Sequence, residues 1–394
     1  MAVEQGTPTS QPAGSRATRG GVSPKPHAPA IHGVETLSKP VSGGGPGPNP
    51  GAFPGFAYYG GPVISCPWVY TSFWGPLWLQ DAAHLESAAQ LCQYHRDLLQ
   101  SDFMNVLSQY GVGWGAGSGV FIQPSFVRNV PTTLTDSGIQ GIIQSCIDAG
   151  VLPEPGNPSN ITLIVYLDET IGINDPNLGL VLCEPTNDTA FGYHNFFMTS
   201  AGNPFYYAMI PALNDACLTE SCPGDDAGCS LHLGERQQQR QTQVASHEFA
   251  EMTTDPQLNA WLDPYNGENG DICNGETDTI TVGDNTWTVQ TTYSKYDDIN
   301  SNGLAFCSSQ EPAPTPRLSF GPLTVTRARH MESYARVLPL PALRFDLQTN
   351  AVTLDHHQLR EYVEKLFYPL HPHDIIGDFP ALLSKIADAM IKGK

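Results

Sequence analysis

The sequence predicts an α+β protein in which helices pack on a mixed β-sheet and one short helix carries the chemically active residues. Runs of β-branched and aromatic residues, typical of strands, alternate with segments of helical hydrophobic periodicity. The run 160–167 is apolar almost throughout, as in a central strand buried on both faces. A Pro-rich stretch at 310–317 sets off a small C-terminal α+β unit.

Composition narrows the classes of protein to consider. The chain has 394 residues, of which 40% are hydrophobic and 15% charged, so it can bury a substantial core. Its net charge of -20 argues against nucleic acid or an anionic membrane surface as a partner. No stretch is long and apolar enough to predict a membrane span. The expected partner, a peptide or protein substrate, follows from the His-Glu pattern described below.

Four segments organise the chain. Residues 1–57 are rich in Gly, Pro and Ser without hydrophobic periodicity, and we expect them to form a disordered leader. Residues 58–309 carry the strand and helix patterns of one large domain. Residues 310–317 form a linker, and residues 318–394 form the small C-terminal unit.

Local patterns predict the elements of the large domain. Residues 62–74 form a first strand, and residues 80–110 one long helix that ends at Gly111. A second helix is capped by Thr135 or Asp136. Further strands are expected at 160–167, 180–183, 190–197 and 205–210, with a hairpin over 279–282 and 287–290.

The C-terminal unit has its own predicted elements. Strand patterns occupy 318–326 and 343–354, a helix begins at Asp355, and a last helix spans 379–392. Four histidines of this unit are expected on the surface and not at a metal: His356, His357, His371 and His373.

The cysteines favour disulfides over metal thiolates. Five of them are disulfide candidates because their spacings lack a C-x-x-C pair. Cys92 and Cys146 fall on apolar helix faces and are expected in the core. The cysteines favour an extracellular or cell-surface setting, although the N-terminus shows no secretory signal pattern. The five candidates are Cys217, Cys222, Cys229, Cys273 and Cys307.

The strongest chemical pattern is Ala-Ser-His-Glu-Phe-Ala-Glu-Met-Thr-Thr-Asp-Pro at 245–256. His247 and Glu251 stand at i and i+4 of a predicted helix that starts near Gln238, so they share one face. Glu248 follows His247 directly, as the general base does in the zinc-peptidase pattern H-E-x-x-H. Glu251 stands where that pattern has its second histidine.

A bound cation would explain the acidity of this helix. Glu251 and Asp255 lie in its C-terminal half, where the helix dipole disfavours each negative charge by roughly 0.3–1 kcal/mol. Neighbouring carboxylates also repel one another. The alternatives are a solvated acidic helix end, or a cap in which Asp255 begins the next turn because the residue before Pro256 leaves helical geometry.

The expected metal ligands are His247 and Glu251, with a third oxygen from Asp255, Glu268 or Asp271. Zinc (Zn2+) is the first choice because of the His-Glu arrangement. Manganese (Mn2+), iron and calcium (Ca2+) also fit a set of one imidazole and two carboxylates. Glu268 and Asp271 lie in a Gly- and Asn-rich loop, so turn formation is the default for both, and a partial calcium loop without the EF-hand spacing is a further alternative.

Two further residues complete the predicted site. His194, on a predicted strand, is a candidate substrate-binding residue that could act as a ligand or an oxyanion donor. Its alternative is a hydrogen-bonded histidine of the sheet. Tyr293 is a candidate catalytic residue that would stabilise an oxyanion from across the cleft.

The order of several short motifs resembles a known family. Over about residues 58–308, the motifs resemble a microbial branch of the phosphate-induced protein 1 (exordium-like) family. Members with a His-Glu-x-x-Glu-x-x-Thr-Asp-Pro stretch look like distant zincin-type metallopeptidases, so the resemblance implies a zincin-like core. The plant members imply an extracellular setting. The motifs are Gly60-Gly61-Pro62-Val63-Ile64-Ser65, Phe73-Trp74-Gly75, Gly192-Tyr193-His194, the 245–256 stretch, Glu268-x-x-Asp271-x-Cys273 and Val289-Gln290-x-x-Tyr293-Ser294.

These observations predict a zinc-dependent metallopeptidase in which Glu248 takes a proton from a metal-bound water. A carboxylate in place of the second imidazole reduces the net positive charge of the metal, so the bound water should be less acidic and catalysis weaker. The alternative is a non-catalytic binding or cell-surface protein that keeps the scaffold with a degenerate or structural zinc or calcium site.

Overall fold

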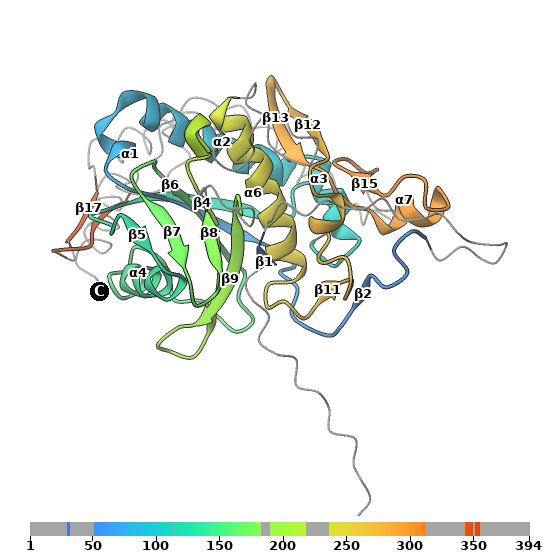
Figure 1. The fold of residues 1–394 in the computed structure, drawn as a ribbon, viewed down its shortest axis with the longest axis horizontal. Coiled ribbons are helices and arrows are strands. Elements are labelled where there is room, and N and C mark those ends of the chain that lie inside the picture. The colour runs from blue at the N-terminus through green and yellow to red at the C-terminus, as the bar shows by residue number, and fades with distance from the viewer. Residues whose placement is uncertain are drawn as a thin grey trace, which may run out of the picture.

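A computed structural model of the protein describes residues 30–31, 51–113, 115–182, 190–217, 236–312, 343–349 and 351–354. These residues form an α+β fold, built on a mixed eight-stranded sheet with helices on both faces (Figure 1). In this part of the chain no helix is long and apolar enough to cross a membrane. The helices are α1 (Leu77–Gln80), α2 (Ala82–Gln100), α3 (Phe103–Ser108), α4 (Asp136–Asp148), α6 (Gln237–Thr254) and α7 (Lys295–Asn300), with a 3-10 turn η1 (Asp271–Cys273).

The central sheet is parallel in its middle and antiparallel towards its edges. Its strands, in spatial order, are β1 (Ala30–Ile31), β9 (Tyr193–Met198), β10 (Pro204–Ile210), β6 (Ile161–Leu167), β3 (Trp68–Trp74), β4 (Val120–Arg128), β16 (Leu343–Asp346) and β17 (Ala351–Leu354). The five strands from β10 to β16 run parallel. β9 and β17 pair antiparallel with their inner neighbours, and β1 pairs antiparallel with β9.

Strand β6 is buried at every residue because helices cover both faces of the sheet. Leu163 and Val165 join the apolar cluster that contains α4, whereas Ile164 and Tyr166 join the cluster that contains α2 and α6. This alternation follows the two-residue period of a strand. The apolar run at 160–167 is therefore a central strand with two buried faces, as predicted.

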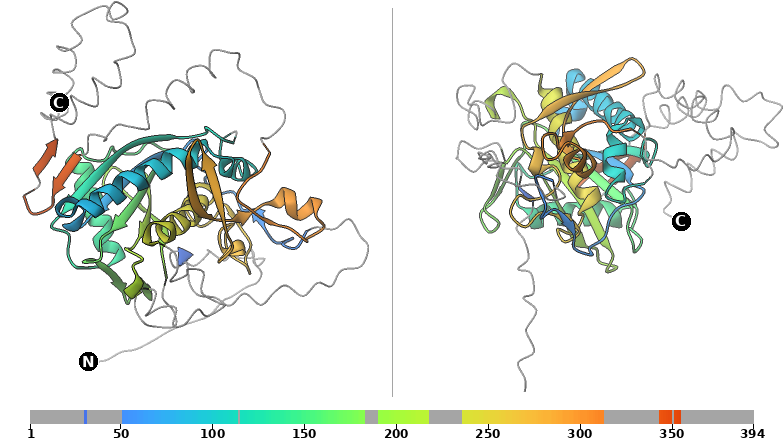
Figure 2. Two further views of the ribbon diagram at one scale, coloured as in Figure 1. Left: turned by 90° about the horizontal axis from the view of Figure 1, so that it is seen from above. Right: turned by 90° about the vertical axis from the view of Figure 1, so that its right-hand side faces the viewer.

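Smaller strand pairs surround the central sheet. The hairpin β12–β13 lies beside α6, on which β13 packs (Figure 2). One of the smaller sheets has three strands, β5 (Thr133–Leu134), β7 (Gly172–Asp175) and β8 (Leu180–Leu182). The others are the pairs β2 (Ala57–Tyr58) with β11 (Trp261–Leu262), β12 (Thr277–Val282) with β13 (Asn285–Gln290), and β14 (Thr292–Tyr293) with β15 (Cys307–Ser308).

The long helix predicted over 80–110 is broken into α2 and α3. Ser101 is extended at the break, where its hydroxyl donates to the carbonyl of Leu98 and accepts from the amide of Phe103. These bonds end one helix and begin the next. The pattern missed the break because apolar residues keep helical spacing across it.

Two other predicted boundaries depend on single residues. The first strand begins at Trp68 and not at residue 62, since Pro67 directly before it has no amide hydrogen to donate to a ladder. The cap of α4 is as predicted, because the Thr135 hydroxyl accepts from the amide of Gly138 at 3.2 Å.

The folded domain extends beyond the predicted segments at both ends. Phe53 and Phe56, assigned to the leader from composition, are buried in an aromatic cluster with Tyr110 and Tyr293. β16 and β17, assigned to the C-terminal unit, extend the central sheet beside β4. The elements expected at 318–326, from Asp355 and at 379–392, and the four histidines of that unit, lie outside the described residues.

The cysteines divide as the sequence predicts where the structure describes them. Cys273 and Cys307 form a disulfide, and Cys217 is also disulfide-bonded. Cys92 and Cys146 are free and buried in the core. Two further candidates, Cys222 and Cys229, lie outside the described residues.

Candidate metal centre

Helix α6 lies at the middle of the molecule and is buried from Arg240 to Thr254. The sheet strands β9 and β10 contact it on one side and β13 on another. The helix ends at Asp255, whose backbone is no longer helical because Pro256 follows it. Polar side chains of this helix are therefore held in a protein interior, where each needs a partner.

The first cluster, which we call the His247 cluster, comprises His247, Glu251 and Asp271. The Nε2 atom of His247 lies 3.0 Å from Oε1 of Glu251, one turn along the helix, and 3.9 Å from Oδ1 of Asp271. The amide of Asp271 donates to the same Glu251 oxygen at 3.1 Å. The Asp271 side chain is 31% exposed, so the cluster has one side open to solvent.

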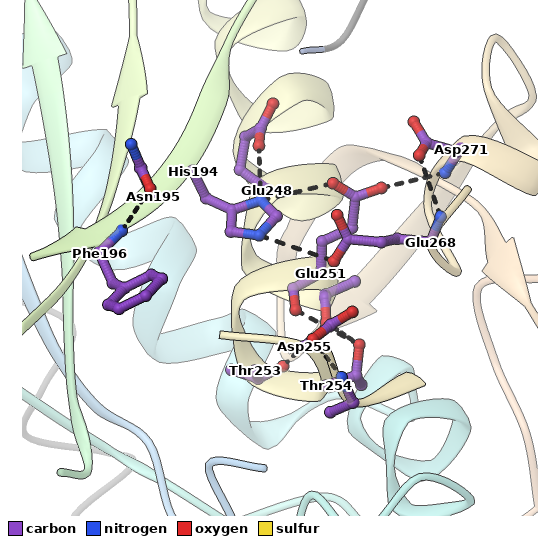
Figure 3. Close-up of polar contacts among 12 residues, drawn as sticks. His194, Asn195, Phe196, Glu248, Glu251, Thr253, Thr254, Asp255, Glu268 and Asp271 are labelled. Carbon is purple, nitrogen blue, oxygen red and sulfur yellow. Dashed lines mark hydrogen bonds and ion pairs between the residues drawn. The ribbon is translucent and has the colours of Figure 1, made fainter. Parts of the chain in front are cut away.

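The second cluster, which we call the His194 cluster, comprises His194, Glu248 and Glu251. Figure 3 shows the His194 ring, which comes from β9, facing these two carboxylates on α6. Its Nδ1 atom lies 3.4 Å from Oε2 of Glu248 and 3.5 Å from Oε2 of Glu251. Its Nε2 atom lies 3.6 Å from Oε1 of Glu268. All three residues of the cluster are buried, so this cluster is closed.

A tight loop brings Glu268 and Asp271 to the helix. The amide of Glu268 donates to Oδ2 of Asp271 at 3.0 Å, and the disulfide at Cys273 ties the loop to β15. Gly270 approaches α6 closely: a Cβ atom there would lie 2.8 Å from both Oε1 of Glu251 and Nδ1 of His247. Only glycine fits at this position without displacing the two side chains.

Gln290 is a site residue that the sequence analysis did not single out. Its Nε2 atom lies 2.6 Å from Nδ1 of His247 and donates to the carbonyl of Gly270 at 2.9 Å. Its own amide donates to the hydroxyl of Ser246 at 2.8 Å. Its place in the Val289-Gln290 motif was the one available signal, because no local pattern links it to a histidine 43 positions away.

The Gln290 side chain sets the tautomer of His247. An amide nitrogen only donates, so Nδ1 accepts, and the proton of the neutral ring is on Nε2, facing Glu251. Burial opposes the charge of His247, but the adjacent carboxylates, Glu251 above all, outweigh it and raise its pKa to about 9. Protonation of Nδ1 would set two N–H groups against each other unless the Gln290 amide turned its oxygen to the ring.

Asp255 and Tyr293 lie outside both clusters. One Asp255 oxygen accepts from the amides of Asn259 and Ala260, at 2.5 and 2.6 Å, and so forms the turn after the helix. The Tyr293 hydroxyl donates to Asp298 at 2.7 Å within the aromatic cluster described above. Asp255 thus occupies the alternative, turn-forming position, and Tyr293 has a partner away from α6.

Burial dominates the titration of the acidic groups. It raises the pKa of Glu248 and Glu268, and raises that of Asp255 to about 6. Burial alone would also raise the pKa of Glu251, but the two neighbouring imidazoles hold it well below its usual range. Burial opposes the charge of His194, yet Glu268 and the α6 carboxylates raise its pKa well above the ordinary value.

Several polar atoms at the centre have no hydrogen-bond partner although they are buried. A buried polar atom without a partner costs roughly 1–3 kcal/mol, so such a group of atoms calls for an explanation. A cation beside Nδ1 of His194 would satisfy one of them, Oε2 of Glu251. The atoms are Nε2 of His194, Oε1 of Glu248, Oε2 of Glu251, Oδ2 of Asp255 and Oε1 of Glu268.

The donors fit a divalent cation that accepts imidazole and carboxylate. Each cluster offers one nitrogen and two oxygens whose ligand atoms lie within 4.8 Å of one another. Zinc takes such sets at about 2.0–2.2 Å, and manganese accepts the same atoms. Comparisons of the chain with protein-family models, curated proteins and solved structures found no match.

Proposed function

We propose that the protein is a zinc-dependent hydrolase of peptide bonds, with the metal held by His247, Glu251 and Asp271. The observation that carries this proposal is the convergence of these three ligand atoms, with Glu248 next to His247 in α6. The resemblance to zincin-type members of the phosphate-induced protein 1 family supports a zincin-like core and an extracellular role.

Each residue has a defined part in this proposal. When bound, the zinc would acidify a coordinated water. Glu248, whose Oε1 atom has no hydrogen-bond partner, would accept a proton at this atom and pass it to the leaving amine. His194 holds the other Glu248 oxygen at 3.4 Å and so fixes the orientation of the base. The exposed edge at Asp271 is the side from which a peptide would approach.

Metal binding at His247 requires one local rearrangement. Nε2 binds a cation only without its proton, so the proton must move to Nδ1. The Gln290 amide must then turn its carbonyl oxygen to Nδ1, which breaks the hydrogen bond from its nitrogen to the carbonyl of Gly270. This oxygen is buried without a partner in the present conformation. Ligating histidines generally donate their second N–H in this way.

A non-catalytic protein with a structural metal is the second candidate. The observation in its favour is the closure of the His194 cluster, in which Glu248 faces an imidazole in the interior. Glu251 in place of an imidazole also argues for slow turnover, because a carboxylate ligand lowers the net positive charge of the metal and makes a metal-bound water less acidic. In this reading zinc or calcium holds α6 to its surroundings.

Metal content and proteolysis, measured together, separate the two candidates. The protein is purified without chelator, its zinc quantified by elemental analysis, and cleavage of unfolded casein followed. We expect His247→Ala to lose the zinc held by its own cluster together with cleavage, and Glu248→Gln to keep at least one zinc per chain but lose cleavage. Zinc-replete protein with no cleavage would favour the structural role. Zinc-free wild-type protein would refute the metal centre itself.

His84 offers a matched control for the histidine variants. It lies between Asp81 and Glu169, at 2.7 and 2.9 Å, but on the surface. Exposed ion pairs contribute little to stability. His84→Ala should therefore keep both the zinc content and the cleavage rate of the wild type.

A further inference from the structure

We infer that the centre holds two divalent cations, the second bound by the His194 cluster, with Glu251 bridging the pair. This inference rests on the metal-binding half of the proposed function and is independent of turnover. The second site is closed: His194, Glu248 and Glu251 have side chains that are 0–1% exposed.

The distances within the His194 cluster are those of ligands around a metal. Charged N–H···O contacts are about 2.7–2.9 Å long, but His194 Nδ1 lies 3.4 and 3.5 Å from its two carboxylate oxygens. Two ligands at about 2.0–2.1 Å from a tetrahedral zinc stand about 3.3–3.4 Å apart. The side chains are thus spaced for a central ion and are too far apart for strong mutual hydrogen bonds.

The two oxygens of Glu251 face different histidines. Oε1 is 3.0 Å from Nε2 of His247. Oε2 is 3.5 Å from Nδ1 of His194, whose ring faces Glu251 in Figure 3. Oε2 has no hydrogen-bond partner although it is buried. A carboxylate with this arrangement bridges two metals, which in two-metal sites stand about 3.5–4 Å apart.

The charges of the centre favour two cations over one. Four carboxylates gather here, and their ion-pair partners among the described residues are His194 and His247. With both imidazoles neutral as ligands and all four carboxylates ionised, the centre carries four negative charges. One divalent cation would leave two of them uncompensated in a largely buried region, whereas two cations would balance all four. The carboxylates are Glu248, Glu251, Glu268 and Asp271.

The roles of the two sites differ by exposure. The His247 cluster opens to solvent at Asp271, as a catalytic site requires. The His194 cluster joins β9 to α6 in the interior, as a structural ion does. Glu248 then binds the inner cation through Oε2, and its Oε1 atom is left for the proton transfer described above.

Stoichiometry tests the inference directly. The full chain is stripped with chelator, reloaded with Zn2+ and dialysed, and its zinc counted by elemental analysis. We expect two zinc ions per chain in the wild type and in His84→Ala, one in His194→Ala, one in His247→Ala and fewer than one in Glu251→Ala. One zinc in the wild type, or two in His194→Ala, would overturn the second site.

A second measurement covers the case in which His194→Ala fails to fold. Glu248→Gln keeps the side-chain shape and should lower the zinc count from two to one. Wild-type protein loaded with Mn2+ should show the exchange-coupled electron paramagnetic resonance spectrum of a bridged pair. A spectrum of uncoupled ions would refute the bridge.

The outcomes also distinguish this inference from the proposed function. Two zinc ions without cleavage would leave the second site intact and reject the hydrolase. One zinc ion with cleavage would reject the second site and support the hydrolase.

Discussion

Replacing Gln290 by leucine tests how the centre is held together. The change removes an amide that donates to Nδ1 of His247 at 2.6 Å and to the carbonyl of Gly270 at 2.9 Å. Nδ1 of His247 and the Gly270 carbonyl would then be buried without a donor, and each would lower the free energy of unfolding by about 1–3 kcal/mol. The change also removes the unpartnered Gln290 carbonyl oxygen, which offsets about 1–3 kcal/mol of this loss. We therefore expect the free energy of unfolding to fall by about 2 kcal/mol.

Urea unfolding measures this loss, as a lower midpoint with an unchanged m-value. The same loss should lower Tm by about 4–8 °C, since a domain of this size loses roughly 2–4 °C per kcal/mol. Gln310→Leu is the control, because Gln310 also donates to a backbone carbonyl, at 3.0 Å, but is exposed. Its effect should stay within about 0.5 kcal/mol. A Gln290→Leu protein as stable as this control would refute the proposed role of the amide.

Three further predictions concern other parts of the molecule. Replacing Cys273 and Cys307 by serine removes a disulfide between residues 34 positions apart. The free energy of unfolding, measured with urea, should fall by about 4 kcal/mol. Burial lowers the pKa of His95 from 6.5 to about 3, so below pH 6.5 the unfolded chain binds a proton that the folded chain excludes. The stability of the wild type should therefore fall relative to His95→Gln by about 1.4 kcal/mol per pH unit between pH 6 and pH 4; parallel pH profiles would contradict this. Removing metal with chelator should lower Tm by about 8–16 °C if the zinc was present at about 1,000 times Kd, and calorimetry before and after reloading with zinc measures the shift.

Elements could be predicted where their own residues show how they are buried or capped. The apolar run of β6 reports helices on both faces, and the cap of α4 needs only Thr135 and the amide of Gly138. The break at Ser101 was not predictable, because it depends on hydroxyl hydrogen bonds and not on apolar spacing. The burial of Phe53 was hidden for another reason: it packs on Tyr293, far along the chain.

The residues of the candidate site also fall into those that could be predicted from local sequence and those that could not. His247 and Glu251 were predictable because helical spacing places them on one face. The contacts of Gln290 with Gly270 and His247, and the position of His194 against Glu248, join residues 20 to 54 positions apart. Such contacts follow from the packing of β9, β13 and the Gly270 loop on α6, which local patterns do not encode.

The burial of α6 along its length has a consequence for how fast the centre can open. A helix that is covered on all sides has no fraying face, so its amides should exchange with deuterium only when the whole domain unfolds. We expect exchange at Val244 and Met252 to report the global free energy of unfolding. An ion enclosed between α6 and β9 should then leave at the pace of that rare opening, much more slowly than one beside the solvent-exposed Asp271.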